Sequence, residues 1–372
     1  MISVKKITTK KDLKQFVIFP FKLYKDCKYW VPPLIKDEME TLDSEKNPVF
    51  KNADASYFLA YKNDKIVGRI AVIINHLEVN ELNKKKVRFG WLDMVDDIEV
   101  TKALLEKVRE IGLSKDLDYM EGPVGFSNME KAGILTRGFE EMNTMITWYH
   151  YPYYAKHFEE LGFEKQATWV EYRLYNPSVP AEKVVKFASL IKKRYSLEVI
   201  RFKNKKEILP YVDEMFDLLN KTYNSLQTFV PIQQYQIDHY KEKYFNFIHP
   251  DYITCIIDEK NKLVAFSVVM PSFSKALKKA NGRLFPFGWY YLLLAQKKND
   301  TAAFYLIGID PKYQGKGVTA LIFQEMGDLF ARKGINQTET NPELKENTAV
   351  QQLWKDYDPV QHKERSTFRK YL

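Results

Sequence analysis

Two glycines separated by one residue, in the run Gln314-Gly315-Lys316-Gly317, form the segment of this sequence best suited to bind an anion. The run follows an apolar stretch with strand character at 303–309 and precedes a helical stripe of apolar residues at 318–333. Glycine lets a backbone approach a ligand closely, and the free N–H groups at a helix N-terminus attract negative charge. The pattern therefore predicts a cradle for a diphosphate group.

The loop matches neither a Walker-type phosphate loop nor the full G-x-G-x-x-G dinucleotide fingerprint. It resembles the Q/R-x-x-G-x-G/A signature of the GNAT family of acyl-CoA N-acyltransferases, except that a threonine occupies the last position. The resemblance implies that acetyl-CoA or another acyl-CoA binds through Gln314, Gly315, Lys316, Gly317, Val318 and Thr319.

A second resemblance lies downstream, where 347–354 is similar to the family pattern N-x-x-A-x-x-L-Y and implies that Asn347 also borders the cofactor. The tyrosine that would protonate the leaving thiolate is replaced by Trp354, and an indole is not a practical acid. Tyr357, one helical turn later, is the nearest substitute. Packing in the core is the alternative role for Tyr357.

The same resemblance implies direct attack of an amine on the thioester, with backbone N–H groups near Gly308 and Ile309 polarising the carbonyl. Gly308 also fits a β-bulge that exposes such a donor, or close packing of the strand. An ammonium must lose a proton before it attacks, so a carboxylate should lie near the cleft. Glu339, at the end of the adjacent strand, is the candidate base, and Glu343 is the weaker alternative.

The elements that must position these residues occur twice along the chain. The decapeptides 4–13 and 199–208 share one pattern, and each is followed by a helical stretch and a hairpin, at 57–71 and 252–269. A strand, a helix and a second strand then follow in each half. The proline-containing run 176–180 marks the boundary near residue 178.

These patterns predict an α/β (α+β) chain of two GNAT-like modules, each a mixed, mostly antiparallel sheet flanked by helices. The modules are 1–178 and 179–372, and an insertion at about 272–300 interrupts the second. Residues 154–164 are similar to the usual ending of a GNAT module. The loop of the first module, 95–100, has no glycine pair but three acidic residues, so it is predicted to be degenerate and unable to bind CoA.

The insertion contains an aromatic cluster and is too short to cross a bilayer. These residues either line an acyl or substrate channel or pack between domains. The cluster consists of Phe285, Phe287, Trp289, Tyr290 and Tyr291.

Composition restricts the remaining possibilities. The net charge of +9 over 372 residues favours an anionic partner, but no nucleic-acid motif accompanies it. Two isolated cysteines, the absence of an H-x-x-x-H pair and the absence of a long apolar run predict a cytoplasmic protein with no metal and no membrane partner.

The expected activity is transfer of an acyl group, with acetyl as the first choice, to a small-molecule or peptide amine. Two alternatives stay open at this stage. One is a non-catalytic CoA-binding or scaffold protein with the same fold. The other is a transferase that takes an aminoacyl group from tRNA, although a tRNA donor has no diphosphate for the loop to bind.

Overall fold

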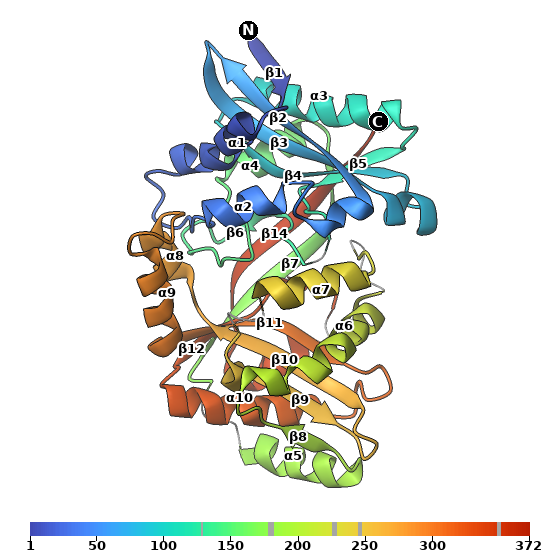
Figure 1. The fold of residues 1–372 in the computed structure, drawn as a ribbon, viewed down its shortest axis with the longest axis vertical. Helices are drawn as coiled ribbons and strands as arrows, with labels where there is room; N and C mark the ends of the chain where they lie inside the picture. The colour runs from blue at the N-terminus through green and yellow to red at the C-terminus, as the bar shows by residue number, and fades with distance from the viewer. Residues whose placement is uncertain (128, 178–181, 225–228, 245–247, 348–350) are drawn as a thin grey trace. The chain divides into compact units, whose positions relative to one another are not determined.

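The computed structural model describes residues 1–127, 129–177, 182–224, 229–244, 248–347 and 351–372 (Figure 1). The chain forms two compact units, neither of which is continuous in sequence. Unit 1 consists of Met1–Val170, Phe273–Leu293 and Lys363–Leu372, and unit 2 consists of Glu171–Ser272 and Leu294–His362. The predicted fold class is confirmed, because each unit contains a mixed, mostly antiparallel sheet with helices on its faces.

The sheet of unit 1 has the strand order β1-β2-β3-β4-β5-β14, and β6 pairs with β14. Its pairs are antiparallel except for β4 with β5. The strands are β1 (Ile2–Lys6), β2 (Ala53–Lys62), β3 (Lys65–Asn75), β4 (Lys86–Met94), β5 (Tyr119–Gly122), β6 (Ile134–Arg137) and β14 (Val360–Tyr371). The helices are α1 (Lys10–Leu23), α2 (Ile35–Thr41), α3 (Ile98–Ser114), α4 (Tyr153–Glu160) and α8 (Ser274–Ala280), and α9 (Gly288–Lys297) begins here.

Both faces of this sheet are buried, because successive side chains of a strand point to opposite faces. Ile70 and Val72 of β3 belong to the core beneath α3, whereas Ala71 and Ile73 belong to the core beneath α1. The near-continuous apolar run of β3 is therefore explained by helices on both sides.

Unit 2 has the strand order β7-β12-β11-β10-β9-β8, with β13 beside β7. Only β11 and β12 are paired in parallel among the pairs described. The strands are β7 (Glu164–Tyr175), β8 (Glu198–Ile200), β9 (Ile253–Ile257), β10 (Leu263–Pro271), β11 (Thr301–Ile309), β12 (Gln337–Glu339) and β13 (Glu343–Leu344). The helices are α5 (Glu182–Arg194), α6 (Leu209–Tyr223), α7 (Gln234–Tyr244) and α10 (Thr319–Lys333).

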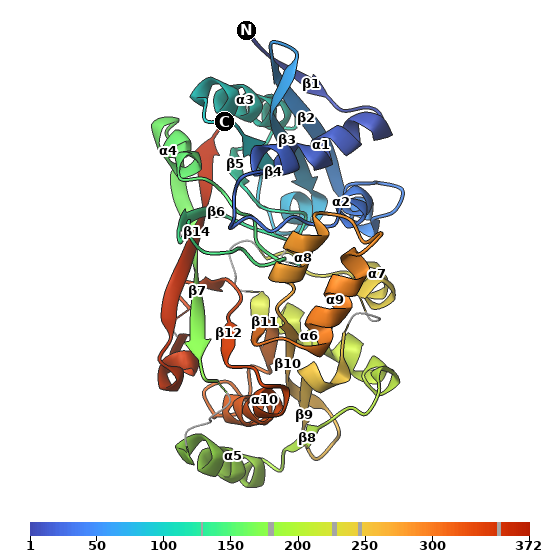
Figure 2. The same cartoon turned by 90° about the vertical axis from the view of Figure 1, so that its left-hand side faces the viewer.

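Helix α10 supplies the largest share of the core of unit 2, through side chains such as Leu321, Phe323 and Phe330. Helix α5 lies beside α10 (Figure 2) and contributes Ala188 and Ile191 to the same core. Helix α6 contacts strands β10 and β11. These contacts hold the turn between β11 and α10 at one end of the sheet.

The compact units differ in extent from the two predicted modules. Strand β14 comes from the end of the chain but pairs with β5 in unit 1, whereas β7 comes from the first half and pairs with β12 in unit 2. The first part of the predicted insertion, 273–293, also belongs to unit 1. The boundary near residue 178 therefore describes the order of the chain and not the limits of the compact units.

The local elements follow the sequence closely. The predicted hairpin of the first half is confirmed, with Asn63 and Asp64 at positive φ between β2 and β3, as a tight two-residue turn requires. The hairpin of the second half, β9 with β10, and both strand-helix-strand units are also confirmed.

Candidate functional site

The turn between β11 and α10 contains two glycines in conformations that side chains rarely adopt. Gly315 has φ +71° and Gly317 has φ +81°. Nothing lies within 4 Å of the position that a Cβ would occupy at Gly315, so this part of the turn is open. A Cβ at Gly317 would collide with the ring of Phe187 on α5. Glycine is therefore required at both positions for conformation and at the second also for space.

Several N–H groups of this turn find no acceptor in the described part of the chain. The neighbouring N–H groups of Tyr313, Gln314 and Lys316 all donate to carbonyl groups within the turn. Helix α10 begins without a side-chain cap, because its N-cap residue Val318 has no side-chain acceptor to offer. The open donors are the N–H groups of Gly315, Gly317, Val318 and Thr319. Such a group of donors at the positive end of a helix fits a diphosphate.

Two side chains complete the turn. The amide of Gln314 donates from Nε2 to the carbonyl oxygen of Ile309 at 3.1 Å, which ties the turn to the end of β11. Lys316 is exposed, and its Nζ lies 5.5 Å from the ring centroids of both Tyr195 and Tyr313. The turn thus offers an exposed cation beside its N–H groups.

Next to this turn, one edge of strand β11 has no strand partner among the described residues, and we call it the open edge. Its parallel pairing with β12 covers only 301–303, whereas β11 continues to Ile309. On the opposite edge, the N–H group of Asp310 donates to Val264 in β10. Because N–H groups alternate between the two edges of a strand, those of Ile307 and Ile309 point toward the open edge, and that of Gly308 points toward β10.

Gly308 and Ile309, which were both predicted to polarise the thioester carbonyl, have their N–H groups on opposite edges of β11. Ile309 faces the open edge as an oxyanion donor should, whereas Gly308 pairs with Phe266, whose ring lies against the position of a Cβ. The β-bulge of β11 lies between Phe304 and Leu306 and not at Gly308. Of the two explanations for this glycine, a bulge or close packing, the structure supports close packing. Ile307 was missed, although strict alternation from Ile309 could have indicated it.

The two candidate bases have different surroundings. Glu339 is buried at the end of β12, and its Oε1 accepts from the guanidinium of Arg173 at 3.1 Å. Glu343 accepts from Nε1 of the buried Trp354 at 2.7 Å. Burial raises the pKa of Glu343 to about 8, and the Trp354 hydrogen bond opposes the shift only in part. A pKa of about 8 suits a base that acts near neutral pH, which favours Glu343.

Trp354 and Tyr357 lie on a short 3-10 helix, Gln352–Tyr357, where residues three apart share a face. Both rings pack against Phe323 of α10, at centroid distances of 5.3 and 5.8 Å. Tyr357 is half-buried in this position. Asn347 precedes this segment, and residues 348–350 of the predicted motif lie outside the described residues.

One polar group near the open edge had no signal in the sequence. The hydroxyl of Tyr223, the last residue of α6, donates to the carbonyl oxygen of Ile307 at 3.3 Å. Burial, with a smaller contribution from the charge of Glu343, raises the pKa of Tyr223 to about 12, so the hydroxyl stays protonated. Tyr223 therefore places a hydroxyl group beside Ile307, at the open edge of β11.

The described residues give no support for a metal site, a disulfide or a membrane-spanning helix. In the described residues, no group of three or more His, Cys, Asp or Glu side chains is arranged to hold a metal ion. Both cysteines are free thiols. None of the described helices combines the length and apolar character needed to cross a bilayer.

Comparison with solved structures identifies the fold. The whole chain aligns with 98% of a tandem GNAT protein from the clavulanic acid biosynthesis pathway, at a TM-score of 0.58 and 11% identity. A GCN5-related N-acetyltransferase from Sphaerobacter thermophilus aligns over 100% of this chain and 95% of its own, at a TM-score of 0.53 and 9% identity. The chain has the tandem GNAT fold, as the sequence predicted.

No protein-family model matches the sequence. Two curated proteins are similar to it over most of their length. Protein YghO of Escherichia coli (strain K12) is 29% identical, covering 94% of this chain and 90% of its own. Bacterial ceramide synthase of Caulobacter vibrioides (strain NA1000 / CB15N) is 24% identical, covering 100% of this chain and 98% of its own.

Proposed function

We propose that this protein is an acyl-CoA-dependent N-acyltransferase that binds acetyl-CoA or another acyl-CoA in unit 2. The observation that carries the proposal is the group of open N–H donors at 315–319, at the start of α10. These donors fit the diphosphate of CoA, and the open edge of β11 beside them can receive the extended pantetheine arm. Asn347 stays a predicted contact of the cofactor.

The reaction is a direct transfer. The amine nitrogen attacks the thioester carbonyl carbon, the C–N bond forms, the C–S bond breaks and CoA leaves as the thiolate. The N–H groups of Ile307 and Ile309 stabilise the developing oxyanion. Glu343 accepts the proton that the ammonium must lose, because its pKa near 8 allows it to exchange protons at neutral pH. Glu339 is the second candidate base. Tyr357 was the predicted acid for the thiolate, but its ring packs against Phe323, and we assign it that packing role.

The relative named Bacterial ceramide synthase narrows the choice of acceptor. A ceramide is an amide of a long-chain amino alcohol, so its synthesis is an N-acylation. We therefore include a long-chain amino alcohol and long-chain acyl-CoA thioesters among the first substrates to test, beside acetyl-CoA and small amines. We place the reaction in the cytoplasm, where acyl-CoA is formed.

Calorimetry with two donors tests the cofactor site. Acetyl-CoA contains the diphosphate, whereas S-acetylpantetheine contains the same thioester without it. We expect acetyl-CoA to bind with one site per chain and S-acetylpantetheine to bind at least about a hundredfold more weakly, because it lacks the charge-assisted hydrogen bonds. Equal affinities would contradict the diphosphate cradle.

Release of free thiol in the presence of each amine then tests turnover. A rate that depends on both the acyl-CoA and one class of amine supports the transferase. Acyl-CoA binding without thiol release from any amine would indicate a binding or scaffold protein instead. Binding of charged tRNA without binding of CoA would indicate an aminoacyl transferase.

A further inference from the structure

Helix α9 has a composition that conflicts with its exposure. Its sequence, Gly-Trp-Tyr-Tyr-Leu-Leu-Leu-Ala-Gln-Lys, is apolar around most of its circumference. A helix of this kind is normally buried on all sides. Of its ten described residues only Gly288 is buried, and Trp289, Tyr290, Leu293 and Leu294 are 45–51% exposed. The helix thus presents apolar surface that the described chain leaves uncovered.

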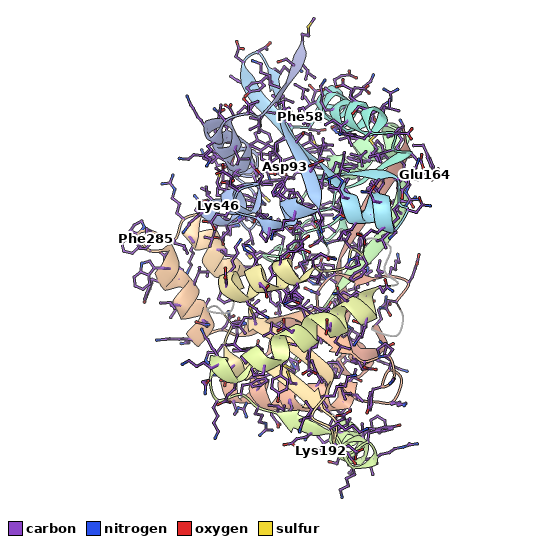
Figure 3. The ribbon with its side chains drawn as sticks, turned by 45° about the vertical axis from the view of Figure 1, so that its right-hand side comes forward. Lys46, Phe58, Asp93, Glu164, Lys192 and Phe285 are labelled. Atoms are coloured by element: carbon purple, nitrogen blue, oxygen red, sulfur yellow. The ribbon has the colours of Figure 1, made fainter. Side chains whose placement is uncertain are left out.

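The turn before α9 extends this surface. Phe285 and Phe287 are 78% and 64% exposed, and Figure 3 shows Phe285 at the edge of the molecule, pointing away from the ribbon. A cavity of about 500 Å³ opens beside these residues, with Phe21 of α1 and Arg283 also in its wall. All residues that line it belong to unit 1. The exposed phenylalanines therefore lie beside a cavity that can admit further apolar groups.

The charged residues between 273 and 299 are all basic, and the first acidic residue after them is Asp300. Between residues 273 and 299 the sequence has six basic residues and no acidic residue. Arg283 immediately precedes the exposed phenylalanines, and Lys297 and Lys298 follow the exposed leucines. A partner that covers this surface should combine apolar groups with negative charge.

The first part of the insertion, 273–293, is tied to the rest of unit 1 by hydrogen bonds and ring contacts. The N–H group of Ile35 in α2 donates to the carbonyl oxygen of Gly282 at 2.9 Å, and the ring of Phe21 lies against Gly282 itself. The ammonium of Lys278 donates to the carbonyl oxygens of Cys27 and Lys28. The exposed aromatic residues therefore extend from a fixed base.

We propose that 283–298 is a membrane-docking surface, which binds the headgroup region of a bilayer that contains anionic lipid. Tryptophan and tyrosine prefer the boundary between headgroups and acyl chains, phenylalanine and leucine enter the apolar layer, and basic residues attract anionic headgroups. Such contact needs no bilayer-spanning helix. A second copy of this chain is a poorer partner, because its equivalent surface has the same positive charge.

Flotation with lipid vesicles tests the proposal on the full chain. We expect binding to vesicles of equal parts phosphatidylcholine and phosphatidylglycerol, and much weaker binding to phosphatidylcholine alone. The double variant Phe285→Ser/Phe287→Ser should reduce binding to the mixed vesicles by about tenfold or more. The matched control is Leu113→Ser on α3, a residue 48% exposed, which should bind like the parent protein.

Charge is tested separately. The triple variant Arg283→Glu/Lys297→Glu/Lys298→Glu should reduce binding to the mixed vesicles by about tenfold or more, since each basic residue near an anionic surface contributes to attachment. A control with the same net charge changes three exposed lysines elsewhere, Lys102→Glu/Lys115→Glu/Lys206→Glu, and should bind more strongly than the first triple variant.

Three results would overturn the proposal. One is absence of binding to either kind of vesicle. Another is that Leu113→Ser and the triple lysine control lose as much vesicle binding as the phenylalanine variant and the first triple variant do. The third is a dimer in sedimentation that the phenylalanine variant abolishes, with no vesicle binding. Melting temperature and acyl-CoA affinity should stay unchanged in every variant, which separates docking from folding and from the function proposed above.

Discussion

The turns that follow β4 in unit 1 and β11 in unit 2 occupy equivalent positions but treat the next helix in opposite ways. After β4, the carboxylate of Asp97 accepts from the N–H group of Glu99 at 3.1 Å and caps α3, and Lys62 binds the same carboxylate at 2.7 Å. After β11, Val318 precedes α10 without a side-chain cap. Unit 1 therefore supplies its own anion to the helix N-terminus, whereas unit 2 leaves that position open.

A second difference concerns the buried carboxylates. In unit 1, Asp93 accepts from Arg69 at 2.7 Å and from the hydroxyl of Tyr24 at 2.9 Å, so both carboxylate oxygens are bound. In unit 2, Glu343 accepts from the uncharged indole of Trp354 at 2.7 Å, and the hydroxyl of Thr340, its other hydrogen-bond partner, is also uncharged. Burial raises the pKa of both carboxyl groups, but only Asp93 has a cation that opposes the shift. Unit 1 thus contains a buried carboxylate in an ion pair, whereas unit 2 contains a buried carboxyl group without a cation beside it among the described residues.

The replacement Gly317→Glu should have the largest effect, because it gives unit 2 the acidic turn of unit 1. A side chain here requires a strained backbone, collides with Phe187 and adds negative charge at the diphosphate position. We expect acyl-CoA affinity to fall by about a thousandfold, or about 4 kcal/mol, measured by calorimetry. Gly334→Glu, at positive φ at the other end of α10, is the control and should retain affinity. If Gly317→Glu still bound acyl-CoA tightly, the N–H groups at 315–319 would not be the diphosphate site, and the turns after β4 and β11 would not differ in cofactor binding.

The variant Glu343→Gln tests the titratable carboxyl. If Glu343 is the base, thiol release by the parent protein should rise with pH up to about 8, and the variant should be slower by about a hundredfold and lose that pH dependence. Glu339→Gln provides the comparison between the two candidate bases. A larger loss in Glu339→Gln than in Glu343→Gln would return the role to Glu339.

The same variant makes a prediction about stability. The pKa of Glu343 is raised from 4.5 to about 8 in the folded state, so the folded protein binds the proton more tightly than the unfolded chain does. Its contribution is fully favourable below about pH 4.5 and is lost as the pH rises toward 8. Urea unfolding should show that the free energy of unfolding of the parent protein falls between pH 5 and pH 8. In Glu343→Gln this fall should be smaller by at least about 1 kcal/mol.

The variant Asp97→Ala tests whether the unit 1 turn is only structural. Loss of the cap should lower the free energy of unfolding by about 1 kcal/mol, measured by urea unfolding. Acyl-CoA should still bind at one site per chain. Asp118→Ala, which removes an exposed carboxylate away from the helix N-terminus, should have a smaller effect on stability. A second acyl-CoA site in Asp97→Ala would show that the two turns differ by the carboxylate alone.

The smallest effect is expected for Tyr357→Phe. The ring packs against Phe323, and phenylalanine can keep that contact. We expect the same rate of thiol release across the pH range, within about twofold, as volume-conserving changes are well tolerated. A lower rate at neutral pH, together with loss of any decline that the parent protein shows at alkaline pH, would instead assign Tyr357 the role of the acid.

The sequence by itself determined the features that depend on neighbouring residues. Asn63 and Asp64 indicate the first hairpin, the glycine pair at 315 and 317 indicates the open turn, and the carboxylates near 97 indicate a capped helix. These features are readable because turn conformations and helix caps are set within a few residues.

Only the tertiary structure decided which carboxyl group is paired, because Arg173 lies 166 residues before Glu339 in the chain. It also placed β14 beside β5, β7 beside β12, and the first part of the insertion, 273–293, in unit 1. Strand partners, the position of a bulge and the burial of a charge all depend on segments far apart in sequence. Local propensity contains no information about those contacts, so the open turn was visible in the sequence but its surroundings were not.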